Sequence, residues 1–363
     1  MTGYDLTDII SHFSIDGDVT ETAPYGEGHI NSTFRVQTTQ DQYILQRINS
    51  DVFQYPEQVM HNIQGVTSFL RERILAHGGD PRRETLTIIP TKDGHTFYRT
   101  PQGDYFRMYL FIDGARTYQI VEKPEHFYYA ARAFGRFQNM LADYPAGDLY
   151  ETIPNFHNTR IRFDTFAKAV ENDKTGRKKD VLPEIEFAMA RRDMGGLLVD
   201  AIAGGSIPLR VTHNDTKFNN VMIDDKTGEG ICVIDLDTVM PGSMLYDYGD
   251  SIRFGANLVE EDERDLSIVC LDLPLFEQFT KGFLEELKSS ITKREIELLP
   301  ESAILMTLEC GIRFLGDHLD GDTYFRIHRE GQNLDRARTQ FKLVADMENR
   351  IDEMREVVAR CMA

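Results

Sequence analysis

The sequence contains no tryptophan, few cysteines and no long apolar run. Its four cysteines, Cys232, Cys270, Cys310 and Cys361, form neither a CxxC pair nor a Cys/His cluster. We therefore expect reduced structural thiols rather than disulfides or zinc ligands. No apolar run approaches the roughly 20 residues that span a bilayer, and the first residues show no basic segment followed by an apolar one. These absences predict a cytoplasmic protein that does not enter a membrane.

Basic residues are also scarce, and this limits the expected partners. Lys and Arg number 40 and Asp and Glu number 59, so the formal net charge is −19. Phosphate backbones and anionic lipids repel such a chain. We expect no nucleic-acid or membrane partner, and we expect any nucleotide site to use a divalent cation. Nothing in the sequence implies a protein partner.

The composition that remains is that of an ordinary globular protein. Hydrophobic residues make up 41% and charged residues 27% of the 363 positions, which argues against intrinsic disorder. At roughly 150 residues per domain, this length predicts two domains or one two-lobed body. The hydrophobic pattern changes after residue 112. We therefore predict an α+β fold with a small lobe at 1–112 and a larger lobe at 113–363.

Residues 1–112 show the pattern of an antiparallel sheet interrupted by one helix. Alternating polar and apolar residues predict strands at Ser32–Thr38 and Gln42–Ile48. A helix is predicted from Pro56 to the glycine pair at 78–79, with one apolar face. Further strands are predicted at 85–90, 96–100 and 105–111, which gives about five strands.

Residues 113–363 show mostly helical periodicity. One helix is predicted to open at Pro124, and others are predicted within 161–200, 274–288, 300–320 and 334–362. Two short strands, at 221–223 and 231–234, interrupt the helices and are joined by a turn. The second lobe is therefore predicted to be mainly α-helical.

The most informative motif is HxDxxxxN at His213–Asn220, followed fifteen positions later by Asp235. Phosphoryl transfer needs a carboxylate that orients the attacking hydroxyl, and it needs oxygen ligands for the divalent cations on ATP. Asp215 is the candidate catalytic base, and Asn220 and Asp235 are the candidate Mg²⁺ ligands. The order and spacing of these residues are similar to those of the catalytic loop and metal-binding aspartate of protein kinases.

The alternative is that Asp215 and Asn219 are turn residues that cap a helix. A lone HxD would favour that interpretation. Here the motif lies between helical segments, leads into a short hairpin and is followed by an aspartate at the end of an apolar strand. This combined context favours catalysis.

The segment before the first predicted hairpin is a candidate phosphate-binding loop. Gly26 and Gly28 permit close backbone approach, and the N–H groups near His29 and Asn31 can bind oxygens. A plain hairpin turn explains the two glycines equally well. The sheet-plus-helix lobe that follows raises the weight of the functional interpretation.

The strand lysine that usually contacts the ATP phosphates in kinase-like proteins is missing. Gln46 occupies the corresponding position, and Arg47 should face the other way because strand side chains alternate. Either another cation or hydrogen bonding through Gln46 takes its place, or the metal neutralises more of the charge. Tyr109 and Phe111, at the transition between the lobes, can offer backbone groups to an adenine ring.

Two further polar regions flank or follow the motif. Asp247 is predicted to begin a helix, to accept backbone N–H bonds and to hold the catalytic loop. Arg313 and Tyr324 belong to a polar stretch at the end of an apolar helix. They can bind a polar substrate, although such a stretch is more commonly explained by charged residues that interact with the end of a helix.

Several longer stretches resemble the N-acetylhexosamine 1-kinases, a subgroup of the aminoglycoside phosphotransferase and choline kinase superfamily. The resemblance runs nearly end to end and is carried by GEGHINSTF, YILQRIN, GSIPLRVTHNDTKFNNVMID, VIDLDTVMPGSMLYDYGDSIRFG and LECGIRFLGDHLDGDTYF. It implies a protein-kinase-like two-lobed fold. It also implies phosphorylation of the anomeric hydroxyl of N-acetylglucosamine or N-acetylgalactosamine, with ATP as co-substrate and Mg²⁺ as cofactor.

The resemblance also implies roles for individual residues. Asp215 matches the catalytic aspartate, and Asn220 and Asp235 match the Mg²⁺ ligands. Arg313 and Tyr324 fall where the subgroup contacts its amino sugar. The lobe at 1–112 would bind the nucleotide, and the lobe at 113–363 would carry catalysis and bind the sugar.

Two other interpretations stay open. The same catalytic parts serve kinases that act on homoserine, choline, methylthioribose or aminoglycosides. The absence of tryptophan weakens the choline option slightly, because quaternary cations favour aromatic cages, while the net charge of −19 would suit polycationic aminoglycosides. Gln46 also suggests a nucleotide-binding regulator without turnover, but such a protein would not need Asp215, Asn220 and Asp235 together.

Overall fold

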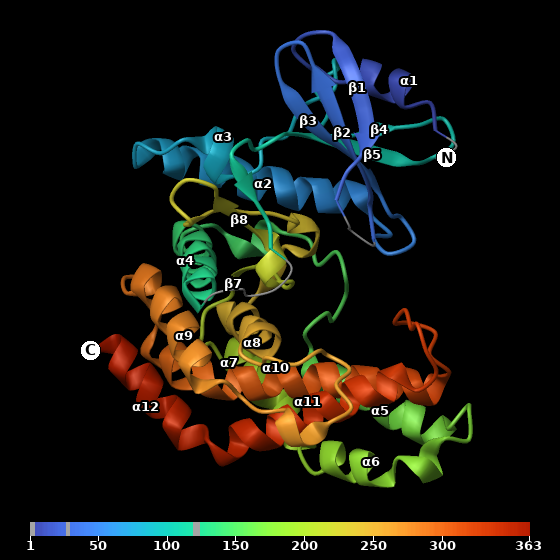
Figure 1. Cartoon of the computed structure of the whole chain (residues 1–363), viewed down its shortest axis with the longest axis vertical. Coiled ribbons are helices and arrows are strands. Elements are labelled where there is room, and N and C mark those ends of the chain that lie inside the picture. The colour runs from blue at the N-terminus through green and yellow to red at the C-terminus, as the bar shows by residue number, and fades with distance from the viewer. Residues whose placement is uncertain (1–3, 27–29, 119–123) are drawn as a thin grey trace. The chain divides into compact units, whose positions relative to one another are not determined.

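The computed structural model describes residues 4–26, 30–118 and 124–363, and it divides into two compact units (Figure 1). The first unit comprises Met1–Arg116, Asp143–Pro154 and Met222–Met240, and the second unit comprises Thr117–Ala142, Asn155–Val221 and Pro241–Ala363. The predicted lobe division at residue 112 stays a prediction.

A five-stranded antiparallel sheet forms the centre of the first unit, with the order β1-β2-β3-β5-β4. The strands are β1 (Val19–Pro24), β2 (Ser32–Thr38), β3 (Gln42–Ile48), β4 (Tyr98–Arg99) and β5 (Tyr105–Leu110). The predicted strands at 32–38 and 42–48 are confirmed. In β2, buried residues alternate with more exposed ones, which is the basis of the sequence pattern.

Helices complete the core of the first unit. α1 (Leu6–Ser11) places Ile9 and Ile10 in a cluster with buried side chains of β2, β3 and β5. α2 (Pro56–Ala76) begins with its proline in the first turn, as predicted. The apolar face of α2 is buried and consists of Val59, Met60, Ile63, Val66, Leu70 and Ile74.

One predicted strand of the first unit is wrong. The segment at 85–90 makes only an isolated bridge between Ile88 and Tyr109, although its backbone also bonds to β5 at two neighbouring positions. Ahead of it lies the short helix α3 (Pro81–Glu84), which was not predicted. Asp80 caps this helix through a bond from the N–H of Arg82, and Pro81 suits its first turn.

The remainder of the first unit is a small sheet and a helical turn. The strands β6 (Ala115–Arg116), β8 (Val221–Asp224) and β9 (Gly230–Val233) form this sheet in the order β6-β8-β9. After β9, the 3₁₀ turn η5 (Leu236–Thr238) packs against α2. The predicted hairpin at 221–234 is therefore confirmed, and it belongs to the first unit.

The second unit is mainly α-helical. α10 (Lys293–Asp320) packs against α5 (Thr159–Asn172), α8 (Met244–Gly255) and α11 (Gln332–Asn349), and α4 (Pro124–Met140) packs against α9 (Leu273–Leu287). A short sheet pairs β7 (Arg210–Thr212) with β10 (Met240–Gly242). The helices are α4 (Pro124–Met140), α5 (Thr159–Asn172), α6 (Leu182–Met189), α7 (Leu197–Ala203), α8 (Met244–Gly255), α9 (Leu273–Leu287), α10 (Lys293–Asp320), α11 (Gln332–Asn349) and α12 (Ile351–Met362).

Two helix boundaries differ from the sequence prediction. α10 begins seven positions before residue 300, because Thr292 and Glu295 form a capping box and Pro300 is accommodated inside the helix. The predicted helix at 334–362 is split between α11 and α12 at Arg350. Within the described part of the chain, no helix has the length and apolarity needed to cross a membrane. The predicted α+β class, with an N-terminal antiparallel sheet and a larger helical part, is confirmed.

Candidate active site

The HxDxxxxN motif forms a loop and a 3₁₀ turn, η4 (Phe218–Asn220), directly after β7. The side-chain amide of Asn220 donates to the backbone oxygen of Asp215 at 2.7 Å and to its carboxylate Oδ2 at 3.1 Å. The ammonium group of Lys217 lies 2.8 Å from Oδ1 of the same carboxylate. The structure therefore brings two of the predicted site residues together and adds a cation that the sequence analysis did not assign.

Lys217 provides a fixed positive charge beside Asp215. Burial lowers the pKa of Lys217, but attraction by Asp215, the hydrogen bond to it and the charge of Asp250 together outweigh this effect, so the net shift is upward. The carboxylate of Asp215 remains 26% exposed, so it is accessible to an incoming hydroxyl group. The lysine lies two positions after the aspartate, which is a spacing that could have drawn attention to it.

Asp247, in the first turn of α8, stabilises the loop by accepting hydrogen bonds from its backbone. It accepts the backbone N–H groups of His213 at 2.9 Å and Asn214 at 2.7 Å, and the amide of Gln138 at 2.6 Å. Burial raises the pKa of Asp247, and these donors together with His213 oppose that rise. Asn214 has a φ of 66°, a left-handed conformation that the bonds to Asp247 help to maintain. The predicted support by Asp247 is confirmed.

Asp235 lies in the first unit, immediately before η5. It is exposed and has φ and ψ of 59°, which is unusual for a residue other than glycine. Within the described residues, no group of three or more His, Cys, Asp or Glu side chains could hold a metal ion. Mg²⁺ often uses only one or two protein oxygens together with water and phosphate oxygens. The carboxylate of Asp235 and the amide oxygen of Asn220, each considered within its own unit, are oxygen donors of the kind that Mg²⁺ accepts.

Gln46, which stands where kinase-like strands usually carry a lysine, belongs to a buried hydrogen-bonded network in the first unit. Gln46 faces Arg107 across the β3–β5 pair, and its Oε1 accepts bonds from Nε of Arg107 at 3.1 Å and from a second guanidinium nitrogen at 2.9 Å. Arg107 also forms an ion pair with Asp237. Asn31 donates to Asp237 at 2.6 Å. The guanidinium of Arg107 therefore stands beside Gln46, on the neighbouring strand.

Electrostatics within this network favour a charged Arg107. Burial lowers the pKa of Arg107, but Asp237 and, more weakly, Asp235 more than offset this, so the net shift is upward. Tyr109 lies under the guanidinium at 5.2 Å, and burial raises the pKa of its hydroxyl. Sequence reasoning missed Arg107 and Asp237. Arg107 lies opposite Gln46 on β5, so it could have been identified from the sequence only if the register between β3 and β5 had been known.

The other predicted nucleotide-binding residues occupy separate positions in the first unit. Gly26 has a φ of 76° in the turn after β1. Gly28 and His29 lie outside the described residues. Phe111 follows β5, where the guanidinium of Arg35 lies 5.0 Å from its ring.

The predicted sugar-binding residues form a cation–aromatic cluster in the second unit. The guanidinium of Arg313 lies 5.4–6.0 Å from three ring centroids, those of Phe156, Tyr324 and Phe325. Arg162 lies 6.0 Å from the ring of Phe156 and donates to its backbone oxygen. Burial and the neighbouring Arg313 lower the pKa of Arg162. Where the structure describes side chains, no carboxylate forms an ion pair with either guanidinium. Arg162 already donates to Phe156, whereas Arg313 keeps N–H donors for an oxygen-bearing group.

Comparison with known families identifies the kind of enzyme. The APH family, described as a phosphotransferase enzyme family, matches residues 21–268. The chain belongs to this family. Its predicted catalytic and metal-binding residues, at 215, 220 and 235, all fall within the matched part of the phosphotransferase.

Solved structures share the fold of this phosphotransferase. An aminoglycoside phosphotransferase from Alicyclobacillus acidocaldarius is 12% identical, with a TM-score of 0.61 over 99% of this chain and 98% of that chain. A microcompartment-associated aminopropanol kinase is 14% identical, with a TM-score of 0.58 over 97% and 99%. An amicoumacin kinase in complex with AMP-PNP, Ca²⁺ and Ami is 13% identical, with a TM-score of 0.55 over 96% and 94%. These similarities confirm the kinase-like fold.

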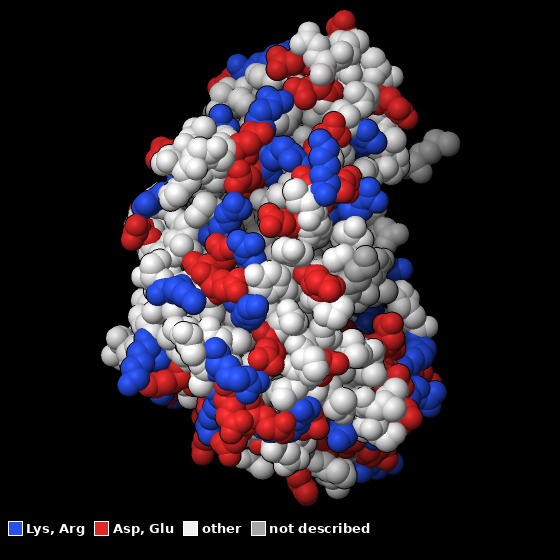
Figure 2. Space-filling model, turned by 60° about the vertical axis from the view of Figure 1, so that its left-hand side comes forward, with Lys and Arg blue, Asp and Glu red and all other residues white. Residues whose placement is uncertain are grey.

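The charged surface of the phosphotransferase is mixed. Figure 2 shows Lys and Arg side chains interspersed with Asp and Glu side chains on one face. This face therefore has no broad basic surface that would attract an anionic nucleotide.

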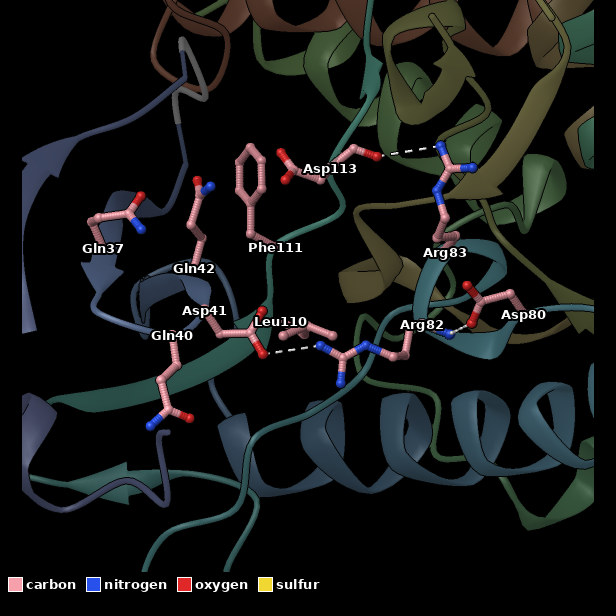
Figure 3. Close-up of a pocket in the computed structure, with 10 residues that line it drawn as sticks. All are labelled: Gln37, Gln40, Asp41, Gln42, Asp80, Arg82, Arg83, Leu110, Phe111 and Asp113. Carbon is pink, nitrogen blue, oxygen red and sulfur yellow. Dashed lines mark hydrogen bonds and ion pairs between the residues drawn. The ribbon is translucent and has the colours of Figure 1, made fainter. Parts of the chain in front are cut away.

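A polar cavity of about 280 Å³ lies in the first unit. Figure 3 shows that Arg82 points toward Asp41 and Arg83 toward the backbone oxygen of Asp113, and both interactions are hydrogen bonds. The lining residues are Gln37, Gln40, Asp41, Gln42, Asp80, Arg82, Arg83, Leu110, Phe111 and Asp113. Phe111 is the one predicted site residue among them. Because both guanidinium groups already bond to neighbouring oxygens, we assign no ligand to this cavity.

Proposed function

We propose that this phosphotransferase transfers the γ-phosphoryl group of ATP to the anomeric hydroxyl of an N-acetylhexosamine. The products would be the sugar 1-phosphate and ADP, and the acceptor would be N-acetylglucosamine or N-acetylgalactosamine. The observation that carries the proposal is the carboxylate of Asp215, which is oriented by Lys217 and Asn220 on a loop held by Asp247.

Asp215 would accept a hydrogen bond from the C1 hydroxyl and take its proton late in the transfer. An anomeric hydroxyl is more acidic than an ordinary alcohol, so positioning contributes more than proton abstraction. Lys217 holds the carboxylate of Asp215 in place and adds positive charge beside the reacting groups. A bound Mg²⁺ would neutralise charge on the transferring phosphoryl group, with Asn220 and Asp235 as its protein ligands. No covalent enzyme intermediate is needed.

The nucleotide half of the proposal has separate support. Asn31, which follows the candidate phosphate loop, is anchored to Asp237 and accepts the backbone N–H of Asn49 at 3.0 Å. The side chain of Asn31 is therefore held by two hydrogen bonds. The amicoumacin kinase with the same fold is bound to an ATP analogue and Ca²⁺. We propose that ATP binds to the first unit through Gly26, Gly28, His29, Asn31, Gln46, Tyr109 and Phe111.

The charge of the Arg313 cluster favours a neutral sugar over a polycation. Arg162 and Arg313 lie close enough that Arg313 lowers the pKa of Arg162. A polycationic aminoglycoside would be repelled here, whereas the amide oxygen and hydroxyl groups of an N-acetylhexosamine can accept bonds from guanidinium groups. The resemblance to N-acetylhexosamine 1-kinases supports the same choice.

A different small-molecule alcohol is the second candidate acceptor. The aminopropanol kinase and the aminoglycoside phosphotransferase share the fold of this chain and have acceptors of other kinds in their names. The overall charge of −19 is the feature of this chain that favours a cationic acceptor. A regulator without turnover is disfavoured by the intact Asp215, Asn220 and Asp235 set.

A coupled ADP assay distinguishes these candidates. MgATP would be combined with N-acetylhexosamines, plain hexoses, choline, homoserine, methylthioribose and aminoglycosides, one acceptor at a time. We expect ADP release with N-acetylhexosamines, and ADP release only with a non-sugar acceptor would contradict the substrate assignment. No ADP release with any acceptor would favour the regulator.

A further inference from the structure

A buried histidine–glutamate pair lies in the second unit, outside the HxDxxxxN loop. His157, just before α5, is 9% exposed, and Glu309, in α10, is 1% exposed. Nδ1 of His157 lies 2.7 Å from Oε1 of Glu309, and the hydroxyl of Thr159 donates to Oε2 of Glu309 at 2.5 Å. Both oxygens of Glu309 are therefore bonded, and one of them fixes the imidazole ring.

The second ring nitrogen of His157 is buried and has no hydrogen-bond partner within the described part of the chain. Buried polar atoms are nearly always paired in folded proteins, so an orphaned nitrogen calls for an explanation. Because a carboxylate can only accept, the bond to Glu309 assigns the proton to Nδ1. In the neutral ring, Nε2 then has a lone pair that can accept a bond from a hydroxyl group.

The surroundings connect this pair to the candidate active site. His157 and Lys217, the partner of Asp215, both lie near enough to Asp250 to act on its pKa. Glu309 lies one helical turn before Arg313, and its pKa is lowered although burial opposes this, because His157 and Thr159 bond to the carboxylate and Arg313 attracts it. The pair is thus within electrostatic range of residues on both the catalytic and the sugar-binding side of the second unit.

Two aromatic rings pack against His157. Phe156 lies edge-on to the imidazole at 4.6 Å, and Tyr246 lies at 5.1 Å. The ring of Phe156 also packs against Arg313. His157 is therefore joined to the Arg313 cluster through a shared aromatic neighbour as well as through Glu309.

We propose that His157 binds one hydroxyl group of the acceptor through Nε2, with Glu309 and Thr159 as positioning residues. This inference rests on the proposed function and narrows the acceptor to a neutral molecule with several hydroxyl groups. A site that hydrogen-bonds a substrate hydroxyl discriminates strongly against the analogue that lacks it, because a buried polar atom is then left unpaired. His157 would therefore determine which hydroxyl pattern is accepted.

His157→Asn tests the proposal, because asparagine can keep a donor for Glu309 near the position of Nδ1 but has no atom at Nε2. Kinetics would be measured with N-acetylglucosamine and its 3-, 4- and 6-deoxy analogues. We expect kcat/KM for the sugar to fall by about 10- to 100-fold, which corresponds to one or two lost hydrogen bonds. KM for ATP should not change.

The deoxy analogues provide a readout that a purely structural role would not give. With the wild-type enzyme, one deoxy analogue should have a much lower kcat/KM than N-acetylglucosamine. With His157→Asn the two values of kcat/KM should be equal, because the variant no longer has the nitrogen that binds the missing hydroxyl. His318→Asn is the matched control, since His318 is also buried and lies on α10. The control should retain the wild-type selectivity among the analogues.

If each deoxy analogue loses the same factor in kcat/KM, relative to N-acetylglucosamine, with His157→Asn as with the wild type, this inference is overturned and the proposed function stays intact. No phosphorylated acceptor with the wild-type enzyme would instead overturn the proposed function and the inference with it. If His157→Asn fails to fold, ¹⁵N NMR of the wild-type histidine rings gives the answer. Sugar binding should shift one Nε2 resonance that is absent in His157→Gln, and no such shift would contradict the proposal.

Discussion

Two polar clusters, one in each unit, use similar residues in different ways. In the first unit, Arg107 and Asp237 are 1% and 4% exposed and neutralise each other. In the second unit, the Lys217–Asp215 pair is partly open to solvent, with side-chain exposures of 41% and 26%. The buried pair is suited to fixing backbone positions, while the open pair keeps a carboxylate accessible to a substrate. Burial, rather than residue type, distinguishes these two ion pairs.

The largest expected effect is on the open pair. Asp215→Asn removes the proton acceptor and the charge that Lys217 balances, so turnover should fall by about 10²- to 10⁴-fold. ATP affinity should be largely retained, because Asp215 is assigned to the acceptor hydroxyl. Steady-state kinetics and calorimetric titration with MgATP measure the two quantities. Turnover like that of the wild type would remove Asp215 from the proposed role.

The buried pair should instead control stability. Arg107→Met leaves Asp237 charged, buried and bonded to Asn31 without its cation, so the free energy of unfolding should fall by about 3–5 kcal/mol. Arg107→Met combined with Asp237→Asn should recover part of this loss, because the uncompensated charge is gone. Urea denaturation measures both variants. A single variant as stable as the double variant would show that the pair is not what stabilises the network.

A lysine at position 46 sharpens the same comparison. Gln46→Lys restores the residue expected in kinase-like strands, but it replaces the acceptor of two bonds from Arg107 with a second cation. We expect a loss of about 1.5–3 kcal/mol of stability and no gain in ATP affinity. Gln46→Glu is the matched variant, since it keeps the acceptor. A stable Gln46→Lys variant with tighter ATP binding would contradict this expectation.

The smallest effect is expected at an exposed ion pair. Arg160 and Asp200 are 57% and 63% exposed, although they lie only 2.5 Å apart. Asp200→Asn should change the free energy of unfolding by less than about 1 kcal/mol, because solvent screens exposed charges. Urea denaturation of Asp200→Asn and Arg107→Met, measured side by side, compares the two losses of unfolding free energy. A loss as large as that of the buried pair would contradict the assignment of their difference to burial.

Local sequence patterns predicted much of the fold. The alternation in β2 and β3 and the apolar face of α2 identified these elements because each depends on side chains that repeat along one segment. The predicted strand at 85–90 is wrong, since only residue 88 of this segment forms a bridge. The predicted helix start at residue 300 is too late, because the capping box at Thr292 sets the true start of α10 and Pro300 is accommodated inside the helix.

The candidate site was predicted only where its residues are close in sequence. Asp215 and Asn220 share one loop, so their spacing carried the information. Arg107 and Gln46 are 61 positions apart, and Asn31 and Asp237 are 206 apart, so only the folded chain joins them. The pairing of His157 with Glu309 was missed for the same reason, since neither residue belongs to a local motif.

The central claim is that the enzyme phosphorylates the anomeric hydroxyl of an N-acetylhexosamine. Phosphorus NMR of a reaction containing MgATP and N-acetylglucosamine or N-acetylgalactosamine tests it most directly. We predict a new phosphomonoester resonance that couples to the anomeric proton and does not form with Asp215→Asn. A phosphomonoester at another carbon, or inorganic phosphate as the sole new species, would contradict the claim.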